Sequence, residues 1–285
     1  MKRGRDMKYK NETCIFKENK VGEVLYLICP LLEQTGLVKH GFSTRIGGVS
    51  EGIWSSMNLS FSRGDKETSV RENFRRMANA LGISEDSFVF SHQTHTTNVR
   101  KVIEEDRGKG IAKPIDYQDV DGLITNVSGI CLSTFYADCV PLYFVDPVRK
   151  AIGLSHSGWR GTVGKIGKVT IEQMQREYGT NPTDVVATIG PSICQECYEV
   201  SEDVIIEFQK SFSKEHWDSI YYKKTNGKYQ LDLWKANEII LLEAGVRKEN
   251  LAVTNLCTCC NSEELFSHRA SQGKRGNLAA FLALK

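Results

Sequence analysis

Residues that can bind a metal or act as a nucleophile gather at the ends of predicted strands. His95 ends a Ser-His-Gln-Thr-His segment, Cys139 follows the apolar run Ile130–Tyr136, and His156 follows the run Ala151–Leu154. Zinc binds nitrogen and sulfur donors tetrahedrally, and catalytic zinc sites keep one position for water. Two imidazoles and one thiolate fit this ligand set, so the sequence predicts a metal site.

Each of these residues also has a simpler interpretation. His92 can face the same metal as His95 or lie on the surface, and histidines in loops are commonly neither ligands nor bases. A buried structural thiol is the commonest role of a free cysteine. Cys139 can also act as a metal-free nucleophile with His156 as its base. Asp138 is a candidate acid beside Cys139, although strand alternation can turn its side chain away.

Two arginines lie near glycine-rich turns that can bind an anion. Arg45 precedes a Gly-Gly pair, and Arg160 follows a His-Ser-Gly-Trp segment at the start of a predicted helix, where negative groups are favoured. The simpler interpretation of the first turn is a tight turn with a surface arginine.

Five further cysteines form two C-x-x-C segments. Cys194 and Cys197 make the first, and Cys257, Cys259 and Cys260 make the second. The chain advances 60 positions from Cys197 to Cys257, against about 15–20 residues in a zinc ribbon. The sequence therefore argues against a four-cysteine zinc site. A thioredoxin-like redox role is also disfavoured, because neither pair opens a helix after a strand.

The composition is that of a globular protein. The 285 residues are 40% hydrophobic and 25% charged, which suits one large domain or two small ones. With 37 Lys and Arg against 35 Asp and Glu, the net charge of +2 argues against nucleic acid or an anionic membrane as the main partner. No apolar run approaches the roughly 20 residues of a membrane span. We expect a cytoplasmic protein, in which nine cysteines are not a disulfide framework.

The elements that must position these residues are helices and strands in mixed order. Helical periodicity covers residues 69–81, 164–178, the segment after Ser201, and 233–244, and Ser69 with Glu72 predicts a capping box. Apolar runs predict strands over 122–125, 130–136, 142–145, 151–154, 185–189 and 251–254. We expect an N-terminal arm at residues 1–20 and a single catalytic domain over residues 21–285.

Together these motifs resemble the YfiH-like proteins, also called the multicopper polyphenol oxidoreductase (laccase-domain) family. The segments that carry the resemblance keep their order from about Gly41 to Leu284: Gly41–Ser50, Asn58-Leu59, Gln93–His95, Asp121-Gly122, Ala137–Cys139, His156–Gly161, Ile189–Val200 and Cys257–Arg269. The sequence departs from the family pattern in two places. Thr96 stands in place of a glycine, and His268-Arg269-Ala270 stands in place of Tyr-Arg-Arg.

The resemblance implies a metal site of His95, Cys139 and His156, usually taken as zinc, with copper as the alternative. It implies an α+β (mixed α/β) fold of packed β-sheets flanked by helices, similar to a toxin deamidase and to cysteine hydrolases. It also implies a purine nucleoside phosphorylase that cleaves S-methyl-5′-thioadenosine and deaminates adenosine. The expected partners are purine nucleosides and phosphate, without nucleic acid or membrane, and a homodimer is the assembly considered.

Phosphorolysis requires an anion site beside the sugar, because phosphate attacks the anomeric carbon as the N-glycosidic bond breaks. Arg45 and Arg160 are the predicted phosphate ligands, with Arg269 behind them, and Asn58 is predicted to bind the base or the ribose. The simpler alternatives are structural bridges for the arginines and a capped turn for Asn58.

Deamination requires an activated water at purine C6 and an acid for the departing ammonia. Cys139, His156 and Asp138 are the predicted catalytic residues. Three other functions use the same residues: copper-dependent phenol oxidation, a metal-free cysteine hydrolase and a non-enzymatic metal-binding regulator. A multicopper oxidase also needs a His-rich trinuclear cluster, whereas this chain has six histidines and no His-x-His pair.

Overall fold

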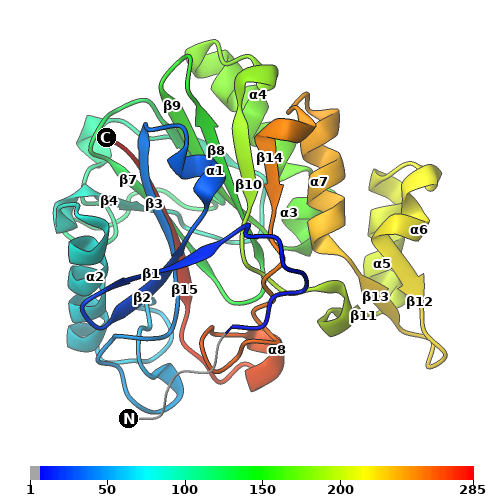
Figure 1. Cartoon of the computed structure of the whole chain (residues 1–285), viewed down its shortest axis with the longest axis horizontal. Coiled ribbons are helices and arrows are strands. Elements are labelled where there is room, and N and C mark those ends of the chain that lie inside the picture. The colour runs from blue at the N-terminus through cyan, green and yellow to red at the C-terminus, as the bar shows by residue number, and fades with distance from the viewer. Residues whose placement is uncertain (1–6) are drawn as a thin grey trace.

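The computed structural model describes residues 7–285 as two six-stranded sheets that pack face to face, with helices on their outer faces (Figure 1). The first sheet contains, in spatial order, β1 (Lys17–Val21), β2 (Val24–Ile28), β3 (Val38–Ser43), β15 (Leu278–Leu284), β7 (Cys131–Tyr136) and β4 (Phe88–Phe90). The second contains β14 (Leu251–Val253), β10 (Val186–Ile189), β8 (Val140–Asp146), β9 (Ala151–Ser157), β6 (Gly122–Thr125) and β5 (Val99–Lys101). A small third sheet contains β11 (Glu199–Val200), β13 (Tyr229–Leu231) and β12 (Tyr221–Lys223).

The helices cover both sheets and the small third sheet. They are α1 (Pro30–Glu33), α2 (Glu67–Leu81), α3 (Trp159–Val163), α4 (Ile166–Tyr178), α5 (Glu202–Ser211), α6 (Trp217–Ile220), α7 (Leu233–Glu243) and α8 (His268–Ser271). α2 lies against the first sheet, whereas α4 and α7 lie against the second (Figure 1). α5, α6 and the third sheet form an outlying part beside α7. No helix in this described part of the chain is long and apolar enough to cross a membrane.

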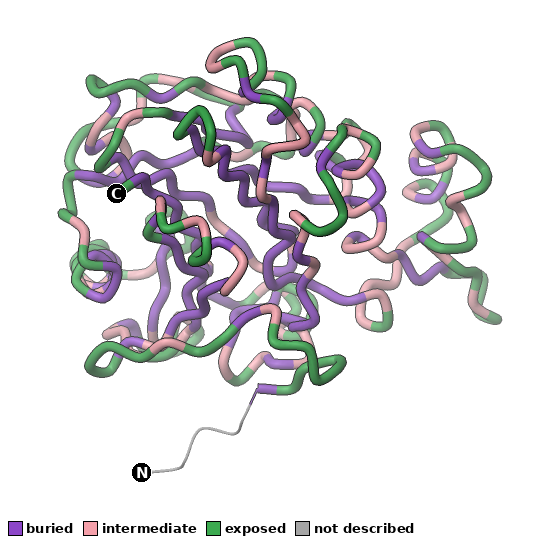
Figure 2. Tube along the Cα trace, turned by 45° about the horizontal axis from the view of Figure 1, so that its top comes forward, coloured by how far each residue is buried: buried purple, intermediate pink, exposed green. Residues whose placement is uncertain are grey.

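Side chains alternate along the central strands, so that each sheet contributes to two cores. On β8, Tyr143 and Val145 belong to the core between the sheets, whereas Leu142 and Phe144 belong to the core under α4 and α7. A third core lies between α2 and the first sheet. Because both faces are covered, β8, β9 and β15 are buried at every residue, which explains their continuous apolar sequences. Figure 2 shows these buried strands inside a surface of exposed loops.

The predicted helices are present with altered ends. α2 begins at Glu67, and Lys66 occupies its N-cap without a side-chain hydrogen bond. The predicted capping box of Ser69 and Glu72 is therefore wrong. Glu72 instead pairs with two arginines of the same helix, because i, i+3 and i, i+4 positions share one face.

The second predicted helix begins at Ile166 instead of residue 164. Lys165 adopts a left-handed conformation (φ 57°) that separates α4 from α3. The other two helices follow Ser201 and Asp232 as predicted, and the Asp232 carboxylate accepts a hydrogen bond from a first-turn amide (2.9 Å).

The six predicted strands are present, although five of them begin or end one to three residues from the predicted limits. The sequence pattern missed β1, β2, β3 and β15, which make up most of the first sheet. Of the predicted arm, residues 1–6 lie outside the described residues. Beyond them Met7 is buried, Tyr9 pairs with Leu256, and Lys17–Val21 form β1.

Candidate active site

Two connections between the sheets bring the three predicted metal ligands together. β4 of the first sheet leads through residues 91–98 to β5 of the second sheet, and His95 lies in this connection. β7 leads to β8 through a short turn that ends with Cys139. His156 lies on β9, opposite Pro141 of β8. One ligand atom from each of the three residues lies within 4.8 Å of the others.

Asp121 fixes the position of both histidines. His156 Nδ1 donates a hydrogen bond to Asp121 Oδ1 (2.8 Å), and the His95 amide donates to the same oxygen (3.1 Å). The amides of Thr94 and Thr96 donate to Oδ2 at 3.0 and 2.9 Å. Burial raises the pKa of Asp121, but these bonds outweigh it and hold the pKa below its ordinary value. The ionised carboxylate therefore holds a proton on His156 Nδ1 and leaves Nε2 to face the other two residues.

The partly buried Cys139 and the buried His156 form a charged pair. Burial raises the pKa of the Cys139 thiol, but the charge and hydrogen bond of His156, assisted by His95, lower it to about 6. Burial lowers the pKa of His156, but the Cys139 thiolate and Asp121 raise it to about 9. A thiolate near neutral pH is the form that binds metals and attacks electrophiles.

Gly158 gives the ligands the space to approach one another. A Cβ atom at this position would lie 2.8 Å from His95 Cδ2 and 3.2 Å from Cys139 Sγ. The backbone of Gly158 is extended (φ −74°, ψ 179°) and is open to any residue. The glycine is therefore required for space rather than for its conformational freedom.

The three ligands fit a metal ion. Their donors are two imidazole nitrogens and one sulfur, and the Asp121 bond to His156 is the outer-shell contact common to metal-binding histidines. Three protein ligands would leave one position of a tetrahedral ion free, as in catalytic rather than structural sites. Zinc and copper both accept this donor set.

A cavity of about 840 Å³ opens at the three ligands, which form part of its wall. Apolar side chains line much of the remainder, including Phe61, Phe90, Ile111, Ile115 and Phe135. Cations also reach the wall, from Arg63, Arg71, Lys113 and Arg275. A cavity of this size and mixed lining is suited to a small organic ligand that carries an anionic group.

The predicted phosphate ligands do not line this cavity in the described chain. Arg45 donates to the carbonyls of Ser55 (2.7 Å) and Ser262 (2.9 Å). The Arg160 guanidinium lies 4.3 Å from the centre of the Trp159 ring. The Arg45 contacts are the structural bridge given as its alternative, whereas Arg160 contacts an aromatic ring and not a carbonyl or carboxylate.

Asn58, Arg269 and Asp138 are also engaged elsewhere. Asn58 is buried and accepts a hydrogen bond from the Asn277 amide (2.9 Å). Arg269 donates from its side chain to two carbonyls near β11, and its amide donates to Asp138 Oδ2 (2.7 Å). Thr258 donates to the other Asp138 oxygen (2.7 Å). Asp138 thus fixes the turn that presents Cys139 and adopts a positive φ of 84°.

Sequence reasoning missed two residues of the site. Asp121 was visible only as part of an Asp-Gly segment, and its role requires the contact with His156. Arg275 lies in the loop between α8 and β15 and carried no motif. Burial and the charge of Arg63 lower the pKa of Arg275 to about 10, so it remains a cation at neutral pH. Its Nε atom is buried without a hydrogen-bond partner.

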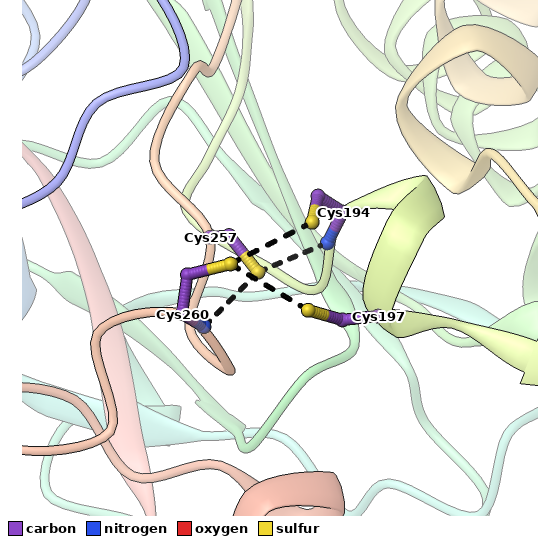
Figure 3. A group of neighbouring side chains, drawn as sticks. All are labelled: Cys194, Cys197, Cys257 and Cys260. Atoms are coloured by element: carbon purple, nitrogen blue, oxygen red, sulfur yellow. Dashed lines mark hydrogen bonds between the residues drawn. The ribbon is translucent and has the colours of Figure 1, made fainter.

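The two C-x-x-C segments lie together, which removes the spacing argument against a shared zinc site. The sulfur atoms of Cys194, Cys197, Cys257 and Cys260 lie within 4.8 Å of one another (Figure 3). β10 and β14 are parallel neighbours, so their carboxyl ends lie side by side although a long excursion separates them in the sequence. The two segments that follow stay together, and the Thr258 amide donates to the Ser192 carbonyl (3.1 Å).

Comparison with known proteins identifies the family. The profile described as multi-copper polyphenol oxidoreductase laccase matches residues 39–285. The chain belongs to this family. It is 37% identical over 246 residues to the purine nucleoside phosphorylase YlmD of Bacillus subtilis strain 168, which covers 86% of this chain and 88% of that protein. It is 36% identical over 234 residues to the adenosine deaminase RL5 of an unknown prokaryotic organism, covering 80% of this chain and 87% of that protein.

Solved structures of this family share the fold. The YfiH protein of Bacillus licheniformis superposes with a TM-score of 0.89 at 33% identity, covering 96% of this chain and 100% of that chain. YlmD of Geobacillus stearothermophilus superposes with a TM-score of 0.87 at 34% identity, covering 95% and 99% of the two chains. The mixed α/β fold with several sheets is thereby confirmed, and its relatives support a nucleoside-processing enzyme. The likeness to toxin deamidases and cysteine hydrolases stays a prediction.

Proposed function

We propose that this protein is a zinc-dependent purine nucleoside phosphorylase that also deaminates adenosine. Its phosphorolysis substrates would be adenosine, inosine, guanosine and S-methyl-5′-thioadenosine. The observation that carries the proposal is the position of His95, Cys139 and His156 in the wall of a cavity that also presents aromatic rings and a buried arginine. The names of the relatives support the same two activities.

The aromatic wall provides a surface for a purine base. Phe90 and Phe135 both line the cavity, and their ring centres lie 5.0 Å apart in an edge-to-face arrangement (82°). A purine has a large π face, and stacking on an aromatic ring stabilises such a base by about 1–3 kcal/mol. Stacking does not discriminate among purines, so this wall would accept adenine, guanine and hypoxanthine alike.

Arg275 is our candidate for the phosphate ligand, in place of Arg45, Arg160 and Arg269. It lines the same cavity as the three metal-site residues and is buried, so phosphate held there would share the cavity with them. In phosphorolysis a phosphate oxygen bonds to the ribose anomeric carbon as the bond to the purine nitrogen breaks. Arg275 would hold the attacking dianion and screen its charge.

The three ligands would hold the metal, and Asp121 would hold the ligands. A bound zinc ion supplies a Lewis acid in the cavity wall. The His156–Asp121 pair keeps the Nδ1 proton of His156 fixed on the side away from the cavity. The two hydrogen bonds to Asp138 favour a positioning role for this residue, since both of its oxygens are occupied.

Product analysis tests the proposal. Purified, zinc-loaded protein is incubated with each nucleoside, with and without phosphate, and bases, ribose 1-phosphate and inosine are separated by chromatography. We expect phosphate-dependent release of free base and phosphate-independent formation of inosine from adenosine. Neither activity should survive in His95→Ala, which leaves Cys139 in place. If no nucleoside is converted, the proposal is wrong, and activity that persists in His95→Ala and under chelation indicates a cysteine hydrolase.

Copper-dependent phenol oxidation is not favoured by the donor residues. Within residues 7–285 only two groups of side chains are arranged to hold a metal, one with two histidines and one with cysteines alone. A trinuclear copper cluster needs many more imidazoles than the six histidines of this chain provide. Oxidation of a phenol by the copper-loaded protein at a rate above that of its nucleoside reactions would reverse this preference.

A further inference from the structure

The four-cysteine cluster has the dimensions of a tetrahedral metal site. Cys260 Sγ lies 3.5 Å from Cys197 Sγ and 4.0 Å from Cys194 Sγ (Figure 3). Sulfur atoms bound to one zinc ion at about 2.3 Å are separated by about 3.8 Å in a regular tetrahedron. The two measured separations lie on either side of that value. All four cysteines are free thiols, and Cys194 and Cys257 are buried.

Backbone amides are already directed at one of the sulfurs. The amides of Cys194 and Cys260 donate to Cys257 Sγ at distances of 3.3 and 3.4 Å. Such bonds stabilise a thiolate more than a thiol, because the charged acceptor is the stronger one. They come from both C-x-x-C segments, so the cluster is organised by the fold and not only by the four side chains.

We propose that Cys194, Cys197, Cys257 and Cys260 bind one zinc ion, in addition to the metal held by the active-site ligands. Four protein ligands leave no open coordination position, so the ion is structural and takes no part in the reaction. Binding releases the remaining thiol protons to water as the four Zn–S bonds form. The site is independent of the proposed activity.

The ion would fix the turn that presents Cys139. Thr258 stands inside the second C-x-x-C segment, and its hydroxyl donates to Asp138 Oδ1 (2.7 Å). The Ile193 amide, beside the first segment, donates to the Asp138 carbonyl (3.0 Å). Joining the two segments through one ion therefore holds both contacts to Asp138, the residue that precedes the active-site cysteine.

Zinc content of the full-length protein tests the site. We expect the Cys194→Ser/Cys260→Ser variant to bind one zinc equivalent less than the wild type, as measured by plasma mass spectrometry. Cys259→Ser is the matched control, because this cysteine lies in the same turn but outside the four-sulfur group. It should retain all the zinc. Equal zinc content in the wild type and the double variant would overturn the proposal.

Differential alkylation tests the same site without a substitution. Zinc-loaded wild-type protein is treated with iodoacetamide before and after chelation, and modified cysteines are located by mass spectrometry. The four cysteines should be protected at least 10-fold by zinc, while the exposed Cys14 reacts equally in both states. Equal reactivity with and without zinc, or recovery of the four as disulfides in the zinc-loaded protein, would contradict a zinc site. Loss of nucleoside activity with retained protection would refute only the proposed function.

Discussion

The Nδ1 atom of His156 lies 2.8 Å from Asp121 Oδ1 in the buried junction between the two sheets. Asp121 also accepts amide hydrogen bonds from the segment that carries His95. A single carboxylate therefore orients two of the three ligands.

Asp121→Asn is expected to weaken metal binding about 10- to 100-fold, the usual effect of removing an outer-shell partner of a ligand. The amide can no longer accept all the bonds that the carboxylate accepts, so His156 and His95 lose their fixed orientation. Zinc affinity is measured by competition with a chromogenic chelator. Asp119→Asn is the control, since the Asp119 carboxylate accepts from a neighbouring threonine and is not bonded to His156. Unchanged affinity in Asp121→Asn would contradict this role.

Gly158→Ala is expected to lower metal affinity and activity together by at least 10-fold. The new methyl group would lie 2.8 Å from a ring carbon of His95, so the ligand must move. Gly161→Ala is the matched control, because its Cβ would make only contacts of 3.4 Å or more. Both variants are compared by zinc titration and by thermal unfolding. Unchanged zinc affinity in Gly158→Ala would show that the added methyl group does not disturb the three metal-site residues.

Arg275→Gln is expected to reduce kcat/KM for phosphate roughly 10- to 100-fold, the loss of a charge-assisted hydrogen bond. Phosphate-independent deamination of adenosine should change much less, which separates a phosphate ligand from a structural residue. Arg160→Gln serves as the comparison, because Arg160 lies against Trp159 outside the cavity lining. If Arg160→Gln raises the KM for phosphate more than Arg275→Gln does, Arg160 is the phosphate ligand, as the sequence predicted.

Thr258→Val is expected to destabilise the protein by about 1–3 kcal/mol, because it leaves the buried Asp138 oxygen without its hydroxyl donor. Valine keeps the shape of threonine, so the change isolates the hydrogen bond. The free energy of unfolding is measured by urea titration. Thr258→Ser retains the hydroxyl and should lose less. Equal free energies of unfolding in the valine and serine variants would show that the hydrogen bond from Thr258 to Asp138 does not stabilise the protein.

His40 is expected to make the protein less stable in acid. Burial lowers the pKa of His40 to about 4 from 6.5, and its Nε2 accepts from the Cys29 amide (2.8 Å). The unfolded chain therefore takes up this proton first as the pH falls. The contribution of neutral His40 to the free energy of unfolding is fully present above pH 6.5. It is lost progressively as the pH falls toward 4, and the total loss is about 3 kcal/mol.

His40→Gln keeps an acceptor without a titrating ring. The difference in unfolding free energy between wild type and variant should narrow from pH 7.5 to pH 4.5 by about 2 kcal/mol or more. Other titrating groups are common to both proteins and cancel in this difference. A difference that is constant with pH would show that His40 does not carry this acid sensitivity.

The structure brings together the three residues that the sequence selected as metal ligands. His95, Cys139 and His156 were selected because their chemistry is rare and each stands beside an apolar strand. The arginines were a weaker prediction, since a guanidinium on a long side chain can reach a cavity or a nearby carbonyl from the same backbone position. Arg45 reaches Ser55 and not the cavity.

The four-cysteine cluster shows where linear spacing misleads. The excursion between the two C-x-x-C segments contains α5, α6 and α7, and its length seemed to exclude a shared site. β10 and β14 pair in parallel, so the segment that follows β14 lies beside the segment that follows β10. Loop-closure entropy grows slowly with length, so a folded excursion of this kind costs little more than a short loop.

The sequence by itself determined the candidate donor atoms, the six predicted strands and the family, because these depend on residue type and on local periodicity. Only the tertiary structure decided which donors meet. Two crossings between the sheets bring His95 and Cys139 to His156, and one parallel strand pair brings the four sulfurs together. Contacts between residues distant in the sequence arise from the pairing of strands in sheets, which the local pattern of one amino-acid sequence does not specify.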